Sequence, residues 1–311
     1  MALSAPLDVI ALSLLPAVLW GFTPVIEKRA LSDGGTPLQA SLVVVLADST
    51  IYLAAIALLE PTPFGGISIE TLAVFALAGA TGTALGRIAI FAGNQRVGAS
   101  ISSAVLSARP LFATALAVGF IGEPLSAPTA VGIAVLVVGL GVLAVAKGGD
   151  LDGWQPRDLL VPLAAAAAFA VGNVARRYGL QLGDASALEA VAINEISALV
   201  ALAAFLAATG RRDVLQKPPR TYIVFAASGT ITAVALLSMF TALAAPEGRI
   251  AVVDPLVATA PLFTIVFSAI WLRDLERVTK GVVAGVLLVV LGAALVTGGP
   301  ALLDAVVAAG A

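Results

Sequence analysis

Long apolar runs separated by short polar connections dominate the hydrophobic pattern of this chain. Residues 38–59 contain one charge, Asp48, and residues 99–121 contain one, Arg109. Residues 281–297 contain none. A helix of about 20 apolar residues crosses the hydrocarbon core of a bilayer. These runs are too long and too uniformly apolar for the strands of a membrane barrel, so the pattern predicts transmembrane helices.

Charges, prolines and glycines interrupt the apolar pattern and divide the chain into ten expected spans. The predicted fold class is therefore all-α integral membrane. This implies a multi-pass protein of the cell membrane, with the lipid bilayer as its first partner. The spans are expected near residues 9–30, 37–59, 70–93, 99–121, 127–146, 158–179, 185–208, 220–244, 250–272 and 279–298.

The two halves of the chain repeat one another. Pro110 matches Pro261 at an offset of 151, and each stands at the start of a Pro-Leu-Phe sequence. An acid follows each proline at the same spacing, Glu123 in the first half and Asp274 in the second. Repetition at a fixed offset is the signature of an internal duplication.

A polar, glycine-rich connection at residues 147–158 lies close to the middle of the chain. We therefore expect two repeats, residues 1–148 and residues 149–311, the second ending in a short C-terminal tail. The offset of 151 continues without a gap into the last span of each repeat, where Gly141 falls on Gly292.

Each repeat has an odd number of spans, so the second must enter the membrane from the side opposite to the first. This predicts two inverted five-helix repeats. Inverted repeats are typical of secondary transporters, whose substrate site lies near mid-membrane between the repeats. We expect spans 1–4 and 6–9 to line a water-accessible central cavity, and spans 5 and 10 to lie at the periphery.

Several short motifs occur in an order that resembles the EamA family of the drug/metabolite transporter superfamily. They are Trp20-Gly21 followed by Lys28, the sequence FAGNQRVGAS at residues 91–100, and the two proline–acid spacings. The resemblance covers residues 10–298. It implies ten helices in two inverted five-helix repeats, and transport of amino acids, other metabolites or drugs, mostly outward.

The second repeat departs from the family pattern at two places. Ala168-Phe169 stands where a Trp-Gly pair is expected, and Asp274, preceded by Arg273, replaces the usual glutamate. These departures bear on the substrate more than on the fold.

The composition excludes several kinds of chemistry. The chain has no cysteine and no histidine, which removes disulfides, thiolate nucleophiles, imidazole bases and the usual ligands of zinc and haem. The formal net charge is −2 without a basic stripe, so nucleic acid is not an expected partner. No Walker sequence occurs, so ATP is not expected to power the protein directly. We expect no enzyme activity, no cofactor and no metal site.

Charged side chains in the middle of the predicted spans mark the candidate substrate site, because each costs about 2.5–3.5 kcal/mol to insert. Acids outnumber bases at these depths, so permanent acid–base pairs would leave one acid without a basic partner. Neutral polar and aromatic residues at similar depth complete the set. The candidate cavity residues are Trp20, Asp48, Arg87, Asn94, Arg109, Asn173, Asn194, Glu195 and Asp254.

Each charged candidate has a functional and a structural interpretation. Arg109 either binds a carboxylate or phosphate of the substrate or pairs permanently with an acid. Asp48 either faces the cavity or pairs with Arg87 or Arg109. Asp254 either binds a cation or proton, or caps the start of its helix. Glu195 is the deeper candidate for proton coupling.

Other candidates have simpler expectations. Trp20 lies mid-span and either lines the cavity or acts as an interfacial anchor. Glu123 and Asp274 lie at the far ends of their spans, where structural or capping roles are expected. Gly82 and Gly86 are spaced as in helix pairs that approach closely.

The basic residues and the resemblance predict opposite orientations. Three Lys and Arg residues, including Arg176, lie in connections on the side of the N-terminus, and twelve lie on the other side. The positive-inside rule then places both termini outside. The resemblance implies that both termini are cytoplasmic.

The expected function is secondary active transport by alternating access, with export of a small metabolite, amino acid or drug-like compound. A proton or a sodium ion is the candidate coupling ion, and the protein is expected to be a monomer or a homodimer. Two alternatives are a lipid-carrier flippase of the same fold and a membrane enzyme that acts on lipid substrates.

Overall fold

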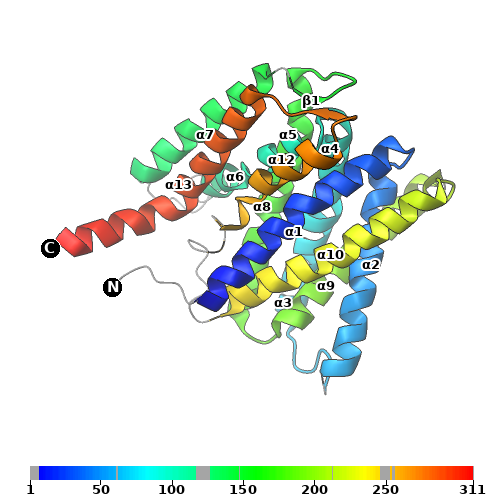
Figure 1. The fold of residues 1–311 in the computed structure, drawn as a ribbon. Coiled ribbons are helices and arrows are strands. Elements are labelled where there is room, and N and C mark those ends of the chain that lie inside the picture. Colours follow the sequence, from blue (N-terminus) through cyan, green and yellow to red (C-terminus); the bar gives the residue numbers. More distant parts are fainter. Residues whose placement is uncertain are drawn as a thin grey trace.

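The computed structural model describes residues 7–60, 62–116, 127–146, 148–211, 213–245, 253 and 256–310. Helices form nearly all of this part of the chain (Figure 1). The elements of the first half are α1 (Leu7–Ser32), α2 (Pro37–Leu59), α3 (Ile69–Ala78), the π-helix η1 (Gly79–Leu85), α4 (Gly86–Val97), α5 (Ala99–Leu106), α6 (Arg109–Leu116) and α7 (Ala127–Val145). Those that follow are β1 (Gly149–Asp150), the 3₁₀-helices η3 (Pro156–Leu159) and η4 (Asp213–Leu215), α8 (Leu160–Leu182), α9 (Ala187–Thr209), α10 (Pro219–Ala244), α12 (Ala260–Trp271), β2 (Glu276–Arg277) and α13 (Lys280–Gly310).

The length and composition of the helices confirm an all-α membrane protein. Among the described residues, six helices are long and apolar enough to cross a membrane: α1, α2, α3 to α4, η3 with α8, α9 and α10. Three shorter apolar helices, in α7, α12 and α13, add to these. The residues expected to form a short C-terminal tail instead continue the last helix, because α13 extends to Gly310.

The predicted fourth span is not one continuous helix. The helix is interrupted at Ser107 and Ala108, between α5 and α6. Pro110 has no N–H to donate to a carbonyl one turn earlier, and tighter bonds replace the lost one, such as that from the Leu111 N–H to the Ala108 carbonyl at 3.0 Å. The described part of the span expected over residues 99–121 therefore consists of two helices, α5 and α6.

The second repeat has the same interruption at the matching place. Residues 258 and 259 form a turn directly before α12, and the Leu262 N–H donates to the Thr259 carbonyl at 2.9 Å. The two interruptions contact each other, because the Ser107 hydroxyl donates to the Ala258 carbonyl at 3.3 Å. The repeated proline thus produces the same local geometry twice.

Glycines allow the third span to approach α8 closely. A Cβ added to Gly82 would lie 2.9 Å from the Cα of Gly172, and one added to Gly86 would lie 3.1 Å from the ring of Phe169. Gly82 lies within η1, and short π-helical segments are frequent at functional sites. The packing role predicted for this glycine pair is confirmed.

Helices α7 and α13 lie side by side at one edge of the molecule (Figure 1). A Cβ on Gly132 would lie 2.7 Å from the nitrogen of Val296, and a Cβ on Gly139 would lie 2.7 Å from the nitrogen of Val289. The contacted residue of α13 comes earlier in the sequence as the residue of α7 comes later, so the two helices run antiparallel.

The same contact pattern occurs from the side of α13. Gly285 packs against Leu143, and Gly292 packs against Leu136. The equivalent glycine of Gly292 is therefore Gly139, at an offset of 153. A Cβ on Gly141 meets nothing within 4 Å. The gapless match of Gly141 with Gly292 is wrong, because two additional residues shift the register in the second repeat.

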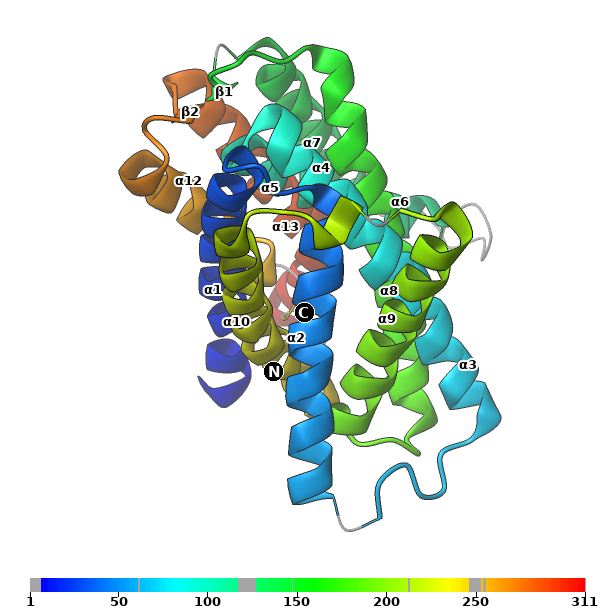
Figure 2. The same ribbon diagram turned by 90° about the vertical axis from the view of Figure 1, so that its right-hand side faces the viewer.

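The connection between the halves is folded onto the rest of the protein. In the antiparallel ladder, Gly149 pairs with Arg277 and Asp150 pairs with Glu276. The indole N–H of Trp154 donates to the Gly148 carbonyl at 2.7 Å. In Figure 2, β1 and β2 lie at the end of the molecule opposite to the connection between α2 and α3.

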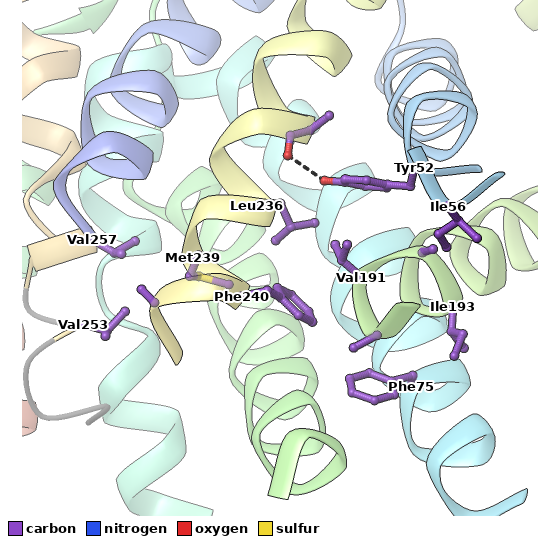
Figure 3. Packing of buried hydrophobic residues seen from close by; sticks show 14 of the residues in the cluster. Tyr52, Ile56, Phe75, Val191, Ile193, Leu236, Met239, Phe240, Val253 and Val257 are labelled. Atoms are coloured by element: carbon purple, nitrogen blue, oxygen red, sulfur yellow. Dashed lines mark hydrogen bonds between the residues drawn. The ribbon is translucent and has the colours of Figure 1, made fainter. Parts of the chain in front are cut away.

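Apolar side chains pack between the helices near the N-terminal end of α1. Figure 3 shows the cluster, in which the Tyr52 hydroxyl donates to the Ala233 carbonyl at 2.8 Å. Phe75 and Phe240 are fully buried there. The same cluster includes Val257. Leu236, Met239 and Val257 of this cluster also line the cavity described next.

Candidate functional site

A cavity lies in the middle of the molecule, between helices of both halves. It encloses about 950 Å³ of empty space, counting the part that is open to solvent. Its described lining residues come from α1, α2, η1, α4, α5, α6, α8, α9, α10 and α12, with Ser107 and Val257 from the two interruptions and their flanks. None of them belongs to α7 or α13. The lining mixes apolar walls, such as Phe91 and Phe169, with several charged groups.

Arg87 of α4 is held between two carboxylates from different helices. Its Nη1 donates to Oδ2 of Asp48 on α2 at 2.7 Å, and its Nη2 lies 3.3 Å from Oε2 of Glu195 on α9. Both carboxylates are fully buried. The 3.3 Å contact is an ion pair without good hydrogen-bond geometry, because Glu195 Oε2 has no hydrogen-bond partner among the described residues.

A second buried arginine, Arg176 of α8, extends this network. It donates to Asn194 Oδ1 at 3.0 Å, to Asn173 Oδ1 at 2.8 Å and to Thr83 Oγ1 at 2.8 Å. The Asn194 amide in turn donates to Glu195 Oε1 at 2.8 Å. The network therefore joins η1 and α4 of the first half to α8 and α9 of the second.

Sequence reasoning placed Arg176 in a connection, and this interpretation was wrong. The residue follows an apolar run and precedes Arg177, so the pair resembled a span end. Helix α8 continues to Leu182, which leaves Arg176 well inside the helix. A signal was present, because Asn173 and Arg176 are three residues apart and therefore share one helix face.

Glu27 of α1 is a buried cavity residue that sequence reasoning did not select. Its carboxylate accepts hydrogen bonds from the Ser228 hydroxyl of α10 and from the Asn94 amide of α4, the latter at 3.3 Å. Trp20, Thr23 and Glu27 all line the cavity. Their spacing follows the helical period and could have identified this face. Instead, the adjacent Lys28 and Arg29 suggested the end of the span.

The structure places most of the predicted site residues at one cavity, and it separates others from it. Asp48 and Asn194 are fully buried behind the lining, where they hold Arg87 and Arg176. Asp254 and Glu123 lie outside the described residues. The predicted residues that line the cavity are Trp20, Arg87, Asn94, Arg109, Asn173 and Glu195.

Arg109 begins α6 directly after the interruption of the fourth span. It is half-buried, lines the cavity and takes part in interactions with its surroundings. It lies near enough to Arg176 for their positive charges to repel each other. Two guanidinium groups from different halves therefore face the same part of the cavity.

Consecutive residues at the end of α1 close one face of the protein, which we call the Lys28 face. Lys28 is buried and forms an ion pair with Asp150, and it donates to the Gln95 carbonyl at 3.0 Å. Arg29 forms an ion pair with Asp274. The hydrogen bond from Arg29 lowers the pKa of the Asp274 carboxyl, whose structural role was expected.

Glu276 joins three elements on the Lys28 face. Its buried carboxylate accepts hydrogen bonds from the backbone N–H groups of Ala99 and Ser100, which begin α5, and from the Ser100 hydroxyl at 2.9 Å. Burial raises the pKa of this carboxyl, although the bonds from Ala99 and Ser100 act in the opposite direction. No sequence pattern pointed to this contact, which spans more than half of the chain.

Carboxylates also join loops on the opposite face, which we call the N-terminal face. Glu189 accepts from the Phe64 N–H at 2.8 Å. Asp184 accepts from the Ser68 N–H at 3.0 Å and from the Thr71 hydroxyl at 2.6 Å. The bonds from Thr71 and Ser68 lower the pKa of the Asp184 carboxyl. Polar contacts between the two halves therefore exist on both faces.

The chemistry available in the cavity is binding by charge and hydrogen bonds. Among the described residues, no group of three or more Asp, Glu, His or Cys side chains is arranged to hold a metal ion. Arginine forks suit carboxylates and phosphates, and the buried carboxylates suit cations or protons. The apolar walls leave room for a small organic molecule.

Comparison with known proteins agrees with this architecture. The chain matches the model of the EamA-like transporter family twice, over residues 8–145 and 157–298. It is similar to a solved crystal structure with a TM-score of 0.59 and 16% sequence identity, over 94% of this chain and 97% of the other. At that identity the likeness concerns the fold alone. No curated protein matches the chain. Because the two matched segments cover nearly the whole sequence, the chain belongs to the EamA-like transporter family, a family of membrane transporters.

Proposed function

We propose that the protein is a secondary active transporter of the cell membrane that exports a small metabolite by alternating access through the central cavity. The observation that carries this proposal is the position of the cavity between the two repeats. The first repeat contributes Arg87 and Arg109 to its wall, and the second contributes Arg176 and Glu195. A site shared by two repeats can be exposed to either side when the repeats move relative to each other.

The proposed topology is ten crossings in two inverted repeats, residues 1–148 and 149–311. Asp150 pairs with Glu276, so an even number of crossings separates them. Helices α8, α9 and α10 supply three, and the segment that ends with α12 supplies the fourth. The Ala99 N–H bonds to the Glu276 carboxylate as well, so the start of α5 lies on the same face as β1. An even number of crossings therefore also separates Ala99 from Asp150, which supports two crossings between α5 and the end of α7. The antiparallel packing of α7 on α13 supports the inversion.

The proposed substrate carries an anionic group and a compact apolar body. Arg109 and Arg176 supply positive charge to one part of the cavity, and Asn173 adds an amide beside them. Phe91, Phe169 and other apolar side chains supply contact area. Amino acids and small phosphorylated or carboxylated metabolites satisfy this description.

Flux measurements in proteoliposomes test the proposal. The purified protein would be assayed with a panel of labelled amino acids, organic acids and sugar phosphates, under imposed proton and sodium gradients. Fluorescent lipids in the same panel test the alternative of a flippase. We expect saturable transport of at least one anionic or zwitterionic metabolite, and none of the lipids.

Arg109→Ala should reduce transport of the anionic substrate roughly tenfold to a hundredfold, because a lost charge-assisted hydrogen bond costs about 1.5–3 kcal/mol. Arg220→Ala is the matched control, since Arg220 is exposed at the start of α10. Unchanged transport in Arg109→Ala would refute the binding role of this arginine. Failure of the unmodified protein to move any compound would refute the proposed function.

A further inference from the structure

We infer that Glu27 is the residue that takes up the coupling proton of the transport cycle. This inference rests on the proposed function and extends it, because it names the coupling ion and its binding group. Sequence reasoning assigned the proton to Glu195 or Asp254, and nothing in the family match concerns Glu27. The surroundings of the carboxyl group carry the inference.

Glu27 combines access to the cavity with burial. It lies on the face of α1 that also contributes Trp20, Thr23 and Pro24 to the cavity wall. Only 5% of the residue is exposed. The carboxyl can therefore exchange a proton with water in the cavity, while the low exposure makes its charge costly in this setting.

The direct partners of Glu27 are neutral, whereas Asp48 and Glu195 each have a cationic partner. Asp48 and Glu195 share the guanidinium of Arg87 as a cationic partner. Glu27 instead bonds to Ser228 and Asn94. No cationic side chain among the described residues lies within salt-bridge distance of it.

The charged groups on the surrounding helices are held elsewhere. On α4, Arg87 attracts the Glu27 carboxylate from beyond contact distance, more weakly than the hydrogen bond from Ser228 does. On α2, Asp48 is bound to that arginine. The next residue of α1, Lys28, is paired with Asp150. Helices α5 and α12 contain no ionisable residue, and α10 has Arg220 at its exposed start.

Both protonation states of Glu27 can be satisfied by these neighbours. The Ser228 hydroxyl donates to the carboxylate, and it can also accept from the carboxylic acid. The Oδ1 atom of Asn94 is buried and has no hydrogen-bond partner among the described residues. The single proton of a neutral Glu27 therefore has two acceptors beside it, the Ser228 hydroxyl and the oxygen of the amide that already bonds to the carboxyl.

Protonation of Glu27 changes the cavity charge by one unit next to the substrate. In the ionised state the carboxylate repels an anionic substrate and attracts a cationic group. The protonated state removes this repulsion. Protonation of Glu27 therefore changes the affinity of the cavity for a charged substrate, and by linkage a bound substrate changes the affinity of Glu27 for the proton.

Carbodiimide labelling tests proton uptake without knowledge of the substrate. N,N′-dicyclohexylcarbodiimide reacts with protonated carboxyls in apolar surroundings, and peptide mass spectrometry locates the adduct. In the full chain in nanodiscs, we expect the adduct at Glu27, with yield falling about tenfold per pH unit above its midpoint. Asp48 and Glu195, which face the Arg87 guanidinium, are the comparison carboxyls within the same chain. An adduct on either of these acids in place of Glu27 would overturn the inference.

Proton flux in proteoliposomes provides the second measurement. Vesicles loaded with a pH-sensitive dye would receive the same metabolite panel, and we expect substrate-dependent proton movement that is lost in Glu27→Gln. Glu70→Gln is the matched control, because Glu70 is an exposed carboxyl at the start of α3. Proton movement that persists in a correctly folded Glu27→Gln protein would also overturn the inference.

Failure of the proton site and failure of the proposed transport function give different results. Labelling of Glu27 without transport of any compound would support the proton site and refute the proposed function. Transport driven by a proton gradient, with no pH-dependent adduct at Glu27, would support the function and refute the proton site.

Discussion

Glu276 illustrates how one carboxyl outside the membrane spans stabilises contacts between distant elements. It lies in β2, and it accepts hydrogen bonds from the first residues of α5. Those N–H groups would otherwise lack partners at the helix start, and a negative group is favoured at that end of a helix. Burial nevertheless raises its pKa, so desolvation of the charged form outweighs these bonds.

The raised pKa predicts how stability depends on pH. The folded protein retains the Glu276 proton more readily than the unfolded chain, so its contribution to stability is present below the ordinary value of 4.5 and declines as pH rises through the folded-state pKa. The slope is at most about 1.4 kcal/mol per pH unit. Glu276→Gln lacks this titration.

The measurement is the difference in thermal unfolding midpoint between the unmodified protein and Glu276→Gln in nanodiscs, over a pH series. The difference should shift in favour of the glutamine variant as pH rises. A shift in the opposite direction would show that the charged form is the stabilised one.

At the scale of elements, the α7 and α13 pair depends on glycines spaced seven residues apart on each helix. Gly132 and Gly139 face α13, and Gly285 and Gly292 face α7. In a bilayer, where lipid is as apolar as leucine, close backbone approach through such small residues drives helix association. The pair contributes no described residue to the cavity, so its contribution is structural.

Gly139→Leu should destabilise the protein, while Gly141→Leu should not. A Cβ at Gly139 would lie 2.9 Å from the Cβ of Leu288, whereas a Cβ at Gly141 meets open space two residues further along the same helix. Overpacking of this kind costs about 1–3 kcal/mol. Thermal unfolding midpoints of the two variants, compared in the same lipid, test this prediction. Equal midpoints would contradict the assigned register.

At the scale of the whole molecule, the end of α1 connects the cavity to closure of the Lys28 face. Glu27 reaches into the cavity, and the next two residues bind Asp150 and Asp274. A rearrangement at Glu27 is therefore adjacent to the contacts that close this face. Opening toward the Lys28 face requires the ion pair between Lys28 and Asp150 to separate.

Lys28→Ala should expose the cavity on the Lys28 face. The chain has no cysteine, so Thr232→Cys in the cavity wall gives a single reporter. If the ion pair between Lys28 and Asp150 stabilises the closed state by about 1–2 kcal/mol, its loss predicts about a 5- to 30-fold faster reaction of the cysteine with an impermeant thiol reagent. Lys280→Ala, an exposed site at the start of α13, is the control.

Asp152→Cys, which is exposed next to β1, identifies the vesicles whose Lys28 face is accessible to the reagent. The interpretation of Lys28 as a closing contact fails if Lys28→Ala reacts at the unmodified rate, or if the increase occurs in the opposite vesicle population.

The sequence predicted the helices better than it predicted the site. Apolar runs locate helices because the hydrocarbon solvent demands them, and the structure places an interruption just before each of the repeated prolines. Glu27 and Arg176 were missed because charges were taken to mark span ends, whereas both lie inside helices and face the cavity. The roles of Asp150 and Glu276 could not be predicted, because their contacts join distant segments and a single sequence contains no local pattern for such contacts.

The contact between the two interrupted helices has a mechanical consequence. The hydroxyl of Ser107 joins the first interruption to the carbonyl of Ala258 at the second. Unwound backbone bends at lower cost than an intact helix, so both bends can occur at one shared point. Helices α5, α6 and α12 can then tilt about this pivot, and a small rotation there becomes a larger displacement at the helix ends that lie far from it.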